Sequence, residues 1–154
     1  MITCHTNNVE ATRALAAAVA PHTKTGDVIM LVGDLGAGKT AFVQGFAQAC
    51  GVTTPVTSPT FTLANIYEGN PRINHLDVYR FESATEVGDL DLDELLDNGV
   101  TLIEWGDIID WALPDDTLEI TITFGDTPDD RILEINSSTN DQQGLSKALE
   151  PWKC

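Results

Sequence analysis

Basic residues are scarce in this chain. Its 154 residues include eight Lys and Arg against 24 Asp and Glu, which gives a formal net charge of -16. Residues 81–130 contain 16 acidic side chains and no Lys or Arg. Such a surface repels the phosphate backbone of nucleic acids, so any role with nucleic acid is expected to be indirect. The acidic surface either faces a basic partner or serves solubility in a salty cytoplasm, and we favour the second interpretation.

Long apolar runs and paired cysteines are also missing. No apolar run approaches the ~20 residues of a membrane span, and no basic segment followed by an apolar one marks a signal peptide. Cys4, Cys50 and Cys154 lie far apart without metal-binding spacing, which predicts free thiols in a reducing, cytoplasmic setting and no membrane partner. The length predicts one domain over residues 1–154, with a weakly structured or helical tail at 136–154.

The most informative pattern present is G-x-x-x-x-G-K-T, a phosphate-binding loop. Its residues are Gly33, Asp34, Leu35, Gly36, Ala37, Gly38, Lys39 and Thr40. The loop follows an apolar run at 28–32, typical of a buried parallel strand, and precedes apolar residues at helical spacing from 42 to 50. Backbone N–H groups of such a loop surround phosphates, while Lys39 reaches the β and γ phosphates and the Thr40 hydroxyl binds magnesium. The sequence therefore predicts a nucleoside triphosphate with Mg2+ as ligand.

The remaining pattern predicts a three-layer, P-loop NTPase-like α/β domain with a mixed, mostly parallel sheet. A capping box at Asn7 and Glu10 predicts a helix that runs to Ala20, and a second box at Ser83 and Glu86 predicts one that ends before residue 99. Further helical segments are expected at 107–113 and 141–150. Strands are expected at 28–32, 61–67, 72–77, 100–103, 117–124 and 131–135. In the strand 117–124, one apolar face is expected to contain Leu118, Ile120, Ile122 and Phe124.

Two carboxylates follow predicted strands, where ligand sites of α/β proteins lie. Asp77 and Glu104 could each hold magnesium, directly or through water, or act as a base; alternatively, each could cap a helix or face solvent. Glu104 is the stronger candidate because four apolar residues precede it. His75 could be a proton shuttle, although a lone strand histidine is more often packed or hydrogen-bonded.

Several signatures of other nucleotide-binding proteins are absent from the sequence. No Asn-Lys-x-Asp element is present for guanine recognition, and residues 77–80 lack the glycine of a Ras-like switch. The four arginines are scattered and do not form the Arg-rich lid of a small-molecule kinase.

Four motifs together resemble the bacterial TsaE ATPases, which are required for threonylcarbamoyladenosine modification of tRNA. They are the loop 33–40, Ser-Pro-Thr-Phe-Thr-Leu at 58–63, His-Leu-Asp-Val-Tyr-Arg at 75–80 and Leu-Ile-Glu-Trp at 102–105. The resemblance runs from about the first helix to the strand that contains Arg131. The phosphate loop is generic, whereas the second and third motifs, in this order, are more specific; the acidic C-terminal part matches poorly.

The resemblance implies roles for the candidate site residues. Thr40 and Glu104 would be the magnesium ligands, and Asp77 would be the catalytic or water-ordering carboxylate. Thr60 would supply the hydroxyl of a switch that senses the γ-phosphate. Lys39 would bind the phosphates and take part in catalysis.

The same resemblance implies the surroundings of the nucleotide. Residues 36–40 would bind ATP phosphates, Trp105 would stack beside the site, and Thr12 and Arg131 would border the adenine.

The resemblance also implies partners: a Kae1-like threonylcarbamoyl transferase subunit and its inactive homologue, on which this protein would act as an ATP-driven reset. Two alternatives stay open, a nucleotide-gated assembly factor that hydrolyses little ATP and a small-molecule kinase, the latter disfavoured by the missing lid.

Overall fold

The structure is a computed structural model that describes residues 1–34, 36–57, 64–77, 92–105, 113–137 and 142–154. Several predictions fall outside these described residues. They include the placement of Leu35 and of Thr60, the start of the strand at 61–67, the helix start at 83–86, the helical turns at 107–112 and the first residue of the helix at 141–150.

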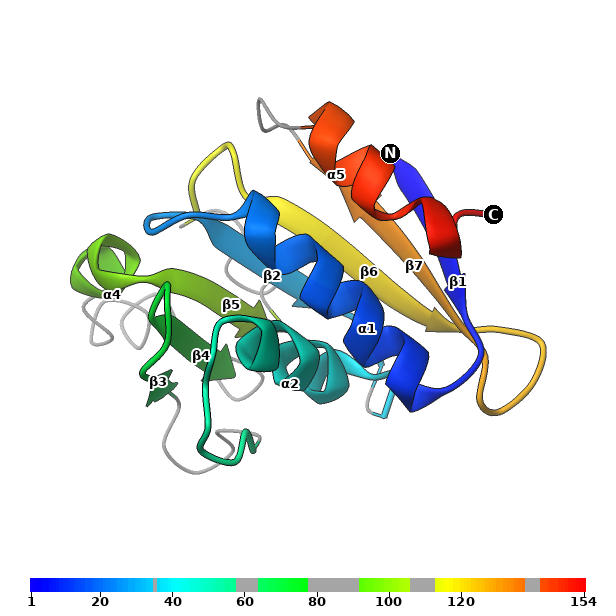
Figure 1. The fold of residues 1–154 in the computed structure, drawn as a ribbon, viewed down its shortest axis with the longest axis horizontal. Coiled ribbons are helices and arrows are strands. Elements are labelled where there is room, and N and C mark those ends of the chain that lie inside the picture. Colours follow the sequence, from blue (N-terminus) through cyan, green and yellow to red (C-terminus); the bar gives the residue numbers. More distant parts are fainter. Residues whose placement is uncertain (35, 58–63, 78–91, 106–112, 138–141) are drawn as a thin grey trace.

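Seven strands form one sheet in the order β1-β7-β6-β2-β5-β4-β3 (Figure 1). The strands are β1 Ile2–Thr6, β2 Val28–Val32, β3 Ala64–Tyr67, β4 Ile73–Asp77, β5 Val100–Glu104, β6 Leu118–Phe124 and β7 Arg131–Asn136. The central strands β6, β2, β5 and β4 are parallel to one another, whereas β7, β1 and β3 join by antiparallel pairing. This arrangement confirms the predicted mixed, mostly parallel sheet.

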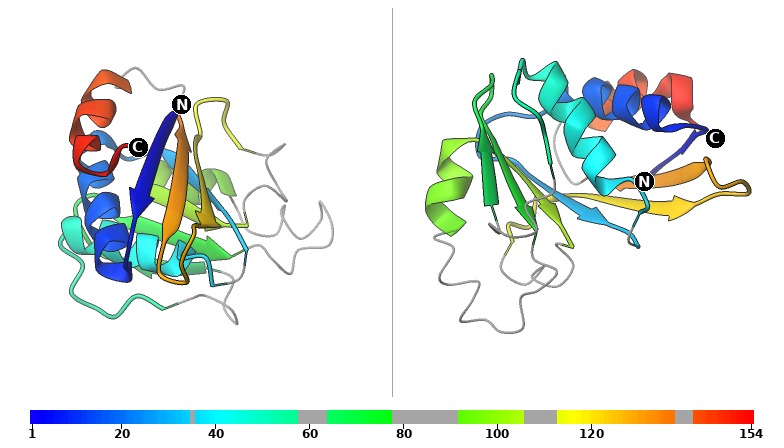
Figure 2. Two further views of the ribbon diagram at one scale, coloured as in Figure 1. Left: turned by 90° about the vertical axis from the view of Figure 1, so that its right-hand side faces the viewer. Right: turned by 90° about the horizontal axis from the view of Figure 1, so that it is seen from below.

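Helices cover both faces of the sheet. The described helices are α1 Val9–Val19, α2 Lys39–Ala49, α4 Leu92–Asn98 and α5 Gln142–Ala148, with 3-10 turns at Ala20–His22 and Glu150–Trp152. Figure 2 shows α1, α2 and α5 together on one face. On the opposite face, Leu95 and Leu96 of α4 pack against Val28, Leu76 and Ile103.

The apolar character of β2 follows from its burial on both faces. Ile29 and Leu31 belong to the core cluster under α1 and α2, whereas Val28 belongs to the cluster that packs against α4. A strand covered on both sides has no polar face, which explains the unbroken run from 28 to 32. Because each fully buried Leu or Ile contributes roughly 1.5–3 kcal/mol, these clusters hold β2, and so the start of the phosphate loop, in place.

The N-terminal strand β1 is a feature that the sequence did not reveal. Its inward-facing residues are Cys4 and Thr6, both buried, and it pairs antiparallel with β7. Small or polar inward residues leave no clear apolar alternation. The predicted cap of the next helix was also wrong by one residue, because the Asn8 side chain, and not that of Asn7, accepts a hydrogen bond from the Ala11 N–H at 2.7 Å.

The strand β6 keeps the predicted alternation except at its last residue. Leu118, Ile120 and Ile122 are buried, but 49% of Phe124 is exposed. The Phe124 ring lies beyond the core, under the guanidinium of Arg131, with 4.5 Å between the Arg131 Cζ atom and the ring centre. A cation–π contact therefore replaces the predicted core position.

The C-terminal segment folds back onto the sheet. The helix α5 lies in the segment predicted to be weakly structured or helical, and its Leu145 is buried against the core that includes α1. The chain then reaches the edge strand β1, where the Cys154 N–H donates to the Thr3 carbonyl at 3.1 Å and the two termini lie near each other (Figure 2).

All three cysteines are free thiols, as predicted. Burial raises the pKa of the Cys4 thiol to about 11, helped by Cys154 and opposed by Lys153, and burial also raises the pKa of Cys50. Both groups are therefore protonated at neutral pH and chemically inert. Among the described helices, none is long and apolar enough to cross a membrane.

The contact between α1 and α2 depends on Gly45. A Cβ atom on Gly45 would lie 2.1 Å from the Arg13 carbonyl oxygen and 2.6 Å from the Arg13 Cα, both backbone atoms of α1. Alanine improves helix propensity by about 1 kcal/mol, but relief of this overlap requires the two helices to separate. Overpacking of this kind typically costs about 1–3 kcal/mol, and backbone atoms give way least readily.

We therefore expect Gly45→Ala to lower the free energy of unfolding by about 1–2 kcal/mol, measured by urea denaturation. The control is Gln48→Ala on the exposed side of the same helix, which should change stability by less than about 0.5 kcal/mol. A Gly45→Ala protein at least as stable as the parent would show that the helix contact adapts without cost.

Candidate nucleotide-binding site

The phosphate loop lies where β2 leaves the sheet and α2 begins. Gly36 has φ +81° and Gly38 has φ +114°, a left-handed backbone that favours glycine. A Cβ atom on Gly33 would lie 2.5 Å from the Ile122 carbonyl oxygen, so this glycine lets the loop pack closely against β6. The helix α2 starts at Lys39 without a side-chain cap. Its N-terminal N–H groups and dipole therefore suit an anion such as a phosphate.

Lys39 lies across the loop and is 5% exposed. Its Nζ donates to the carbonyls of Gly33 at 2.6 Å and Asp34 at 3.0 Å, and it lies 4.1 Å from the centre of the Trp105 ring. Two carbonyls and an aromatic face compensate the buried ammonium group. The structure thus places the lysine cation within the loop, and contact with phosphate oxygens stays a prediction.

Trp105 has an uncommon backbone conformation for a bulky residue. Its φ is +63°, and its N–H donates to the Leu31 carbonyl of β2 at 3.0 Å. Left-handed backbone costs a non-glycine residue of order 1–3 kcal/mol and persists where the surroundings fix it. The turn after β5 brings the Trp105 ring against Lys39 of the loop, and stacking of the ring beside a nucleotide stays a prediction.

The two predicted carboxylates lie on adjacent strands. Asp77 is paired in register with Glu104, so both stand at the carboxyl ends of β4 and β5. Glu104 is 4% exposed, and Thr40 Oγ1 donates to its Oε1 at 3.2 Å and its Oε2 at 3.4 Å. Glu104 lies on the strand next to β2, whereas Asp77 is one strand further from the loop.

A buried histidine, His75, contacts Glu104, and the sequence did not identify this partner. His75 is fully buried, and its Nε2 lies 2.5 Å from Glu104 Oε2. The prediction that a strand histidine is packed or hydrogen-bonded is confirmed. The i, i+2 spacing of His75 and Asp77 places both on the sheet face that Glu104 shares, which is the available sequence signal for this contact.

Thr12 and Arg131 border the loop itself. Thr12 is buried, with 2.7 Å between its Oγ1 and that of Thr6, and its methyl group faces Gly38. Arg131 Nε donates to the Ala37 carbonyl at 2.9 Å, and Nη2 donates to the Gly36 carbonyl at 3.4 Å. These contacts brace the loop from two sides, and contact with adenine stays a prediction.

The segment that leads toward Thr60 is anchored to the same elements. Gln44 of α2 donates from Nε2 to the Val56 carbonyl at 3.2 Å, and the Tyr67 hydroxyl donates to the Thr57 carbonyl at 3.2 Å. Thr40 precedes Gln44 by one turn of α2, so the bond places Val56 beside the helix that carries Thr40.

No group of three or more His, Cys, Asp or Glu side chains that could hold a metal is found among the described residues. Magnesium commonly binds through one or two carboxylates together with substrate phosphates and water. The donor set of Thr40 and Glu104 beside a phosphate loop fits that mode of binding, because the nucleotide would complete the coordination.

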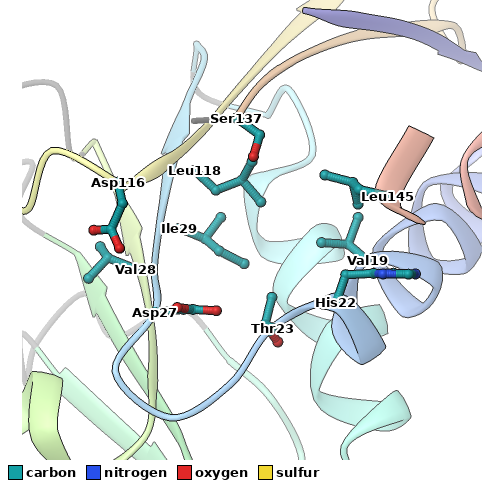
Figure 3. Close-up of a pocket in the computed structure, with 10 residues that line it drawn as sticks. All are labelled: Val19, His22, Thr23, Asp27, Val28, Ile29, Asp116, Leu118, Ser137 and Leu145. Atoms are coloured by element: carbon teal, nitrogen blue, oxygen red, sulfur yellow. The ribbon is translucent and has the colours of Figure 1, made fainter. Parts of the chain in front are cut away.

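Figure 3 shows a separate cavity at the opposite end of β2. It is lined by residues that include Val28, Asp27, Leu118 and Leu145. The space open to the centre of a water molecule is about 10 Å³, so the cavity has room for about one water molecule. This cavity is too small for a nucleotide and does not compete with the loop.

The strand–loop–helix unit, the loop lysine and the strand-end carboxylates define a P-loop NTPase-like protein. Comparison with known proteins gives the particular family. The family model described as threonylcarbamoyl adenosine biosynthesis protein TsaE matches residues 6–132. The chain belongs to the TsaE family, as the four motifs predicted.

Individual relatives agree with this assignment. The TsaE protein of Bacillus subtilis is 48% identical over 119 residues, which cover 76% of this chain and 74% of that protein. The TsaE protein of Rickettsia bellii is 38% identical, covering 85% of this chain and 92% of its own. The crystal structure of Bacillus subtilis YdiB matches with a TM-score of 0.80 and 36% identity, covering 98% of this chain and 97% of that chain.

Proposed function

We propose that this protein is a Mg2+-dependent ATPase of threonylcarbamoyladenosine biosynthesis, which resets a partner transferase complex by ATP hydrolysis. The relatives named TsaE support the pathway. The observation that carries the nucleotide chemistry is the hydrogen bond from Thr40 to the buried Glu104, next to a phosphate loop whose lysine is already in place.

Thr40 and Glu104 would hold the metal ion. A bound magnesium ion neutralises charge on the phosphates and on the transition state for phosphoryl transfer. The protein groups would bind and orient the reactants: Lys39 and the N–H groups of 36–40 would bind the phosphates, and Asp77 would orient the attacking water. Thr60 would sense the γ-phosphate.

The other site residues would hold the nucleoside. Trp105 would lie along one side of the nucleotide, and Thr12 and Arg131 would border the adenine from the two sides on which they brace the loop. The absence of a guanine-recognition element favours ATP over GTP.

The proposed partners are a Kae1-like transferase subunit and its inactive homologue in the cytoplasm. A net charge of -16 opposes direct binding of tRNA by this chain, because tRNA affinity depends on cationic contacts to phosphates. The protein would therefore act on tRNA only indirectly, through the partner complex.

ATP turnover with and without the two partner subunits tests this function. We expect slow phosphate release from the protein alone, faster release when both partners are added, and loss of release when EDTA removes Mg2+. ATP binding without partner-stimulated release would favour the alternative of a nucleotide-gated assembly factor. GTP turnover as fast as ATP turnover would contradict the proposed preference for adenine.

A further inference from the structure

Among the described residues, Glu104 is the one hydrogen-bond partner of the His75 imidazole, and this bond connects His75 to the site. Its imidazole is fully buried in β4, and its Nε2 lies 2.5 Å from Glu104 Oε2. Its other nitrogen, Nδ1, is buried and has no hydrogen-bond partner in the part of the chain that the structure describes. The Tyr67 ring packs nearby, with 6.2 Å between ring centres.

This asymmetry assigns the proton of the imidazole. A neutral imidazole has one N–H donor and one bare acceptor nitrogen. A buried N–H group without a partner is the more costly of the two to leave unpaired, and a carboxylate can only accept. The proton therefore lies on Nε2, and His75 donates to Glu104.

The donated hydrogen bond constrains the Glu104 side chain. A free glutamate side chain has several rotatable bonds and loses much rotamer entropy when ordered, so one contact at its tip seldom fixes it. Here Oε2 is held by His75 on one side, and the Thr40 hydroxyl donates to the carboxylate from α2 on the other. The carboxylate is thus fixed across the space between β5 and the loop before any ligand binds.

We propose that His75 is a positioning residue of the nucleotide site: it orients the Glu104 carboxylate so that Glu104 and Thr40 bind Mg2+ together. The inference rests on the proposed function, in which these two residues hold the metal. Hydrogen-bond partners of metal ligands typically change metal affinity by about 10- to 100-fold when removed. His75 touches neither metal nor nucleotide and acts through Glu104.

Three substitutions at this position separate the hydrogen bond from packing. Gln ends in an N–H group at the depth of the imidazole Nε2, whereas the shorter Asn ends at the depth of Nδ1. Leu fills similar volume without a donor. We expect His75→Leu and His75→Asn to raise the Mg2+ concentration for half-maximal ATP binding by about 10- to 100-fold, and His75→Gln to restore most of the loss.

The measurement is calorimetric titration of ATP across a range of Mg2+ concentrations, with ATP binding in EDTA as the second readout. Binding in EDTA should be the same in all three variants, because His75 does not contact the nucleotide. A variant that loses binding equally with and without Mg2+ would indicate a packing role and overturn the proposal. If His75→Leu does not fold, the comparison of the Asn and Gln variants decides.

Glu104→Ala distinguishes failure of the positioning role of His75 from failure of the proposed function. If Glu104→Ala raises the Mg2+ requirement but His75→Leu and His75→Asn do not, the positioning role is overturned and the proposed function stands. If Glu104→Ala leaves the requirement unchanged, both fail. Independently, 15N NMR of the imidazole in the unmodified protein should show a proton on Nε2, and a bare Nε2 would overturn the proposal.

Discussion

Replacement of Lys39 by alanine is expected to weaken Mg2+-dependent ATP binding by about 2–4 kcal/mol, roughly 30- to 700-fold. The Lys39 ammonium lies within the loop, 2.6 Å from the Gly33 carbonyl oxygen, at the position where the loop motif predicts the β and γ phosphates. A charge-assisted contact in a nearly buried site contributes more than a surface ion pair, because solvent screens it less. Calorimetry with ATP and Mg2+ measures the loss.

The main complication is that Lys39 also holds the loop together. Its removal leaves the carbonyls of Gly33 and Asp34 without their donor, so part of the loss could come from a changed loop. Lys39→Met keeps most of the side-chain volume but removes the ammonium group, both its charge and its N–H donors, so it should lose nearly as much affinity as Lys39→Ala. Lys24→Ala is the matched control, because Lys24 is 85% exposed and pairs with Asp27 away from the loop. Unchanged ATP affinity in both Lys39 variants would refute the assignment.

The sequence predicted the parts of this protein whose patterns are local. The strand at 28–32 is buried on both faces, the loop is a contiguous motif, and the helix after it has a clear apolar period. For the same reason the mixed sheet and the order of its main elements could be predicted. The strand β1 could not, because its buried residues Cys4 and Thr6 are small or polar and give a weak period.

The site shows the same division. The sequence predicted that Asp77 and Glu104 each lie at a strand end, and the structure adds that the two strands are adjacent and pair the two residues in register. The bond between His75 and Glu104 and the position of Phe124 under Arg131 depend on side chains that are 29 and seven residues apart, respectively. Both contacts join side chains on different strands, and Phe124 is paired with Arg131 across the β6–β7 hairpin. The strand patterns indicate which faces these residues share, but the side-chain contacts themselves became visible only with the tertiary structure.

Glu104 and Asp77 are expected to differ in what their loss changes. Glu104 lies on β5, the strand beside β2, and is 4% exposed. Its carboxylate accepts a hydrogen bond from the Thr40 hydroxyl, and this bond places Glu104 against the loop. Asp77 stands one strand further, about 4.8 Å away by strand spacing, and is only partly buried. This geometry favours Glu104 as the metal ligand and leaves Asp77 to orient water or to couple hydrolysis to the partner complex.

Glu104→Ala should therefore raise the Mg2+ concentration needed for half-maximal ATP binding by at least about tenfold. Loss of a residue that only supports a metal ligand already costs about 10- to 100-fold in metal affinity. Asp77→Ala should leave that concentration nearly unchanged and lower partner-stimulated turnover by about 100-fold or more, the usual contribution of a positioned acid or base. Glu104→Gln serves as the control for volume, since it keeps the side-chain length while removing the charge. Reversed phenotypes would exchange the two roles. If neither variant changes binding or turnover, the catalytic carboxylates do not lie at the ends of β4 and β5, because a residue that holds the metal or the water must change one of the two quantities.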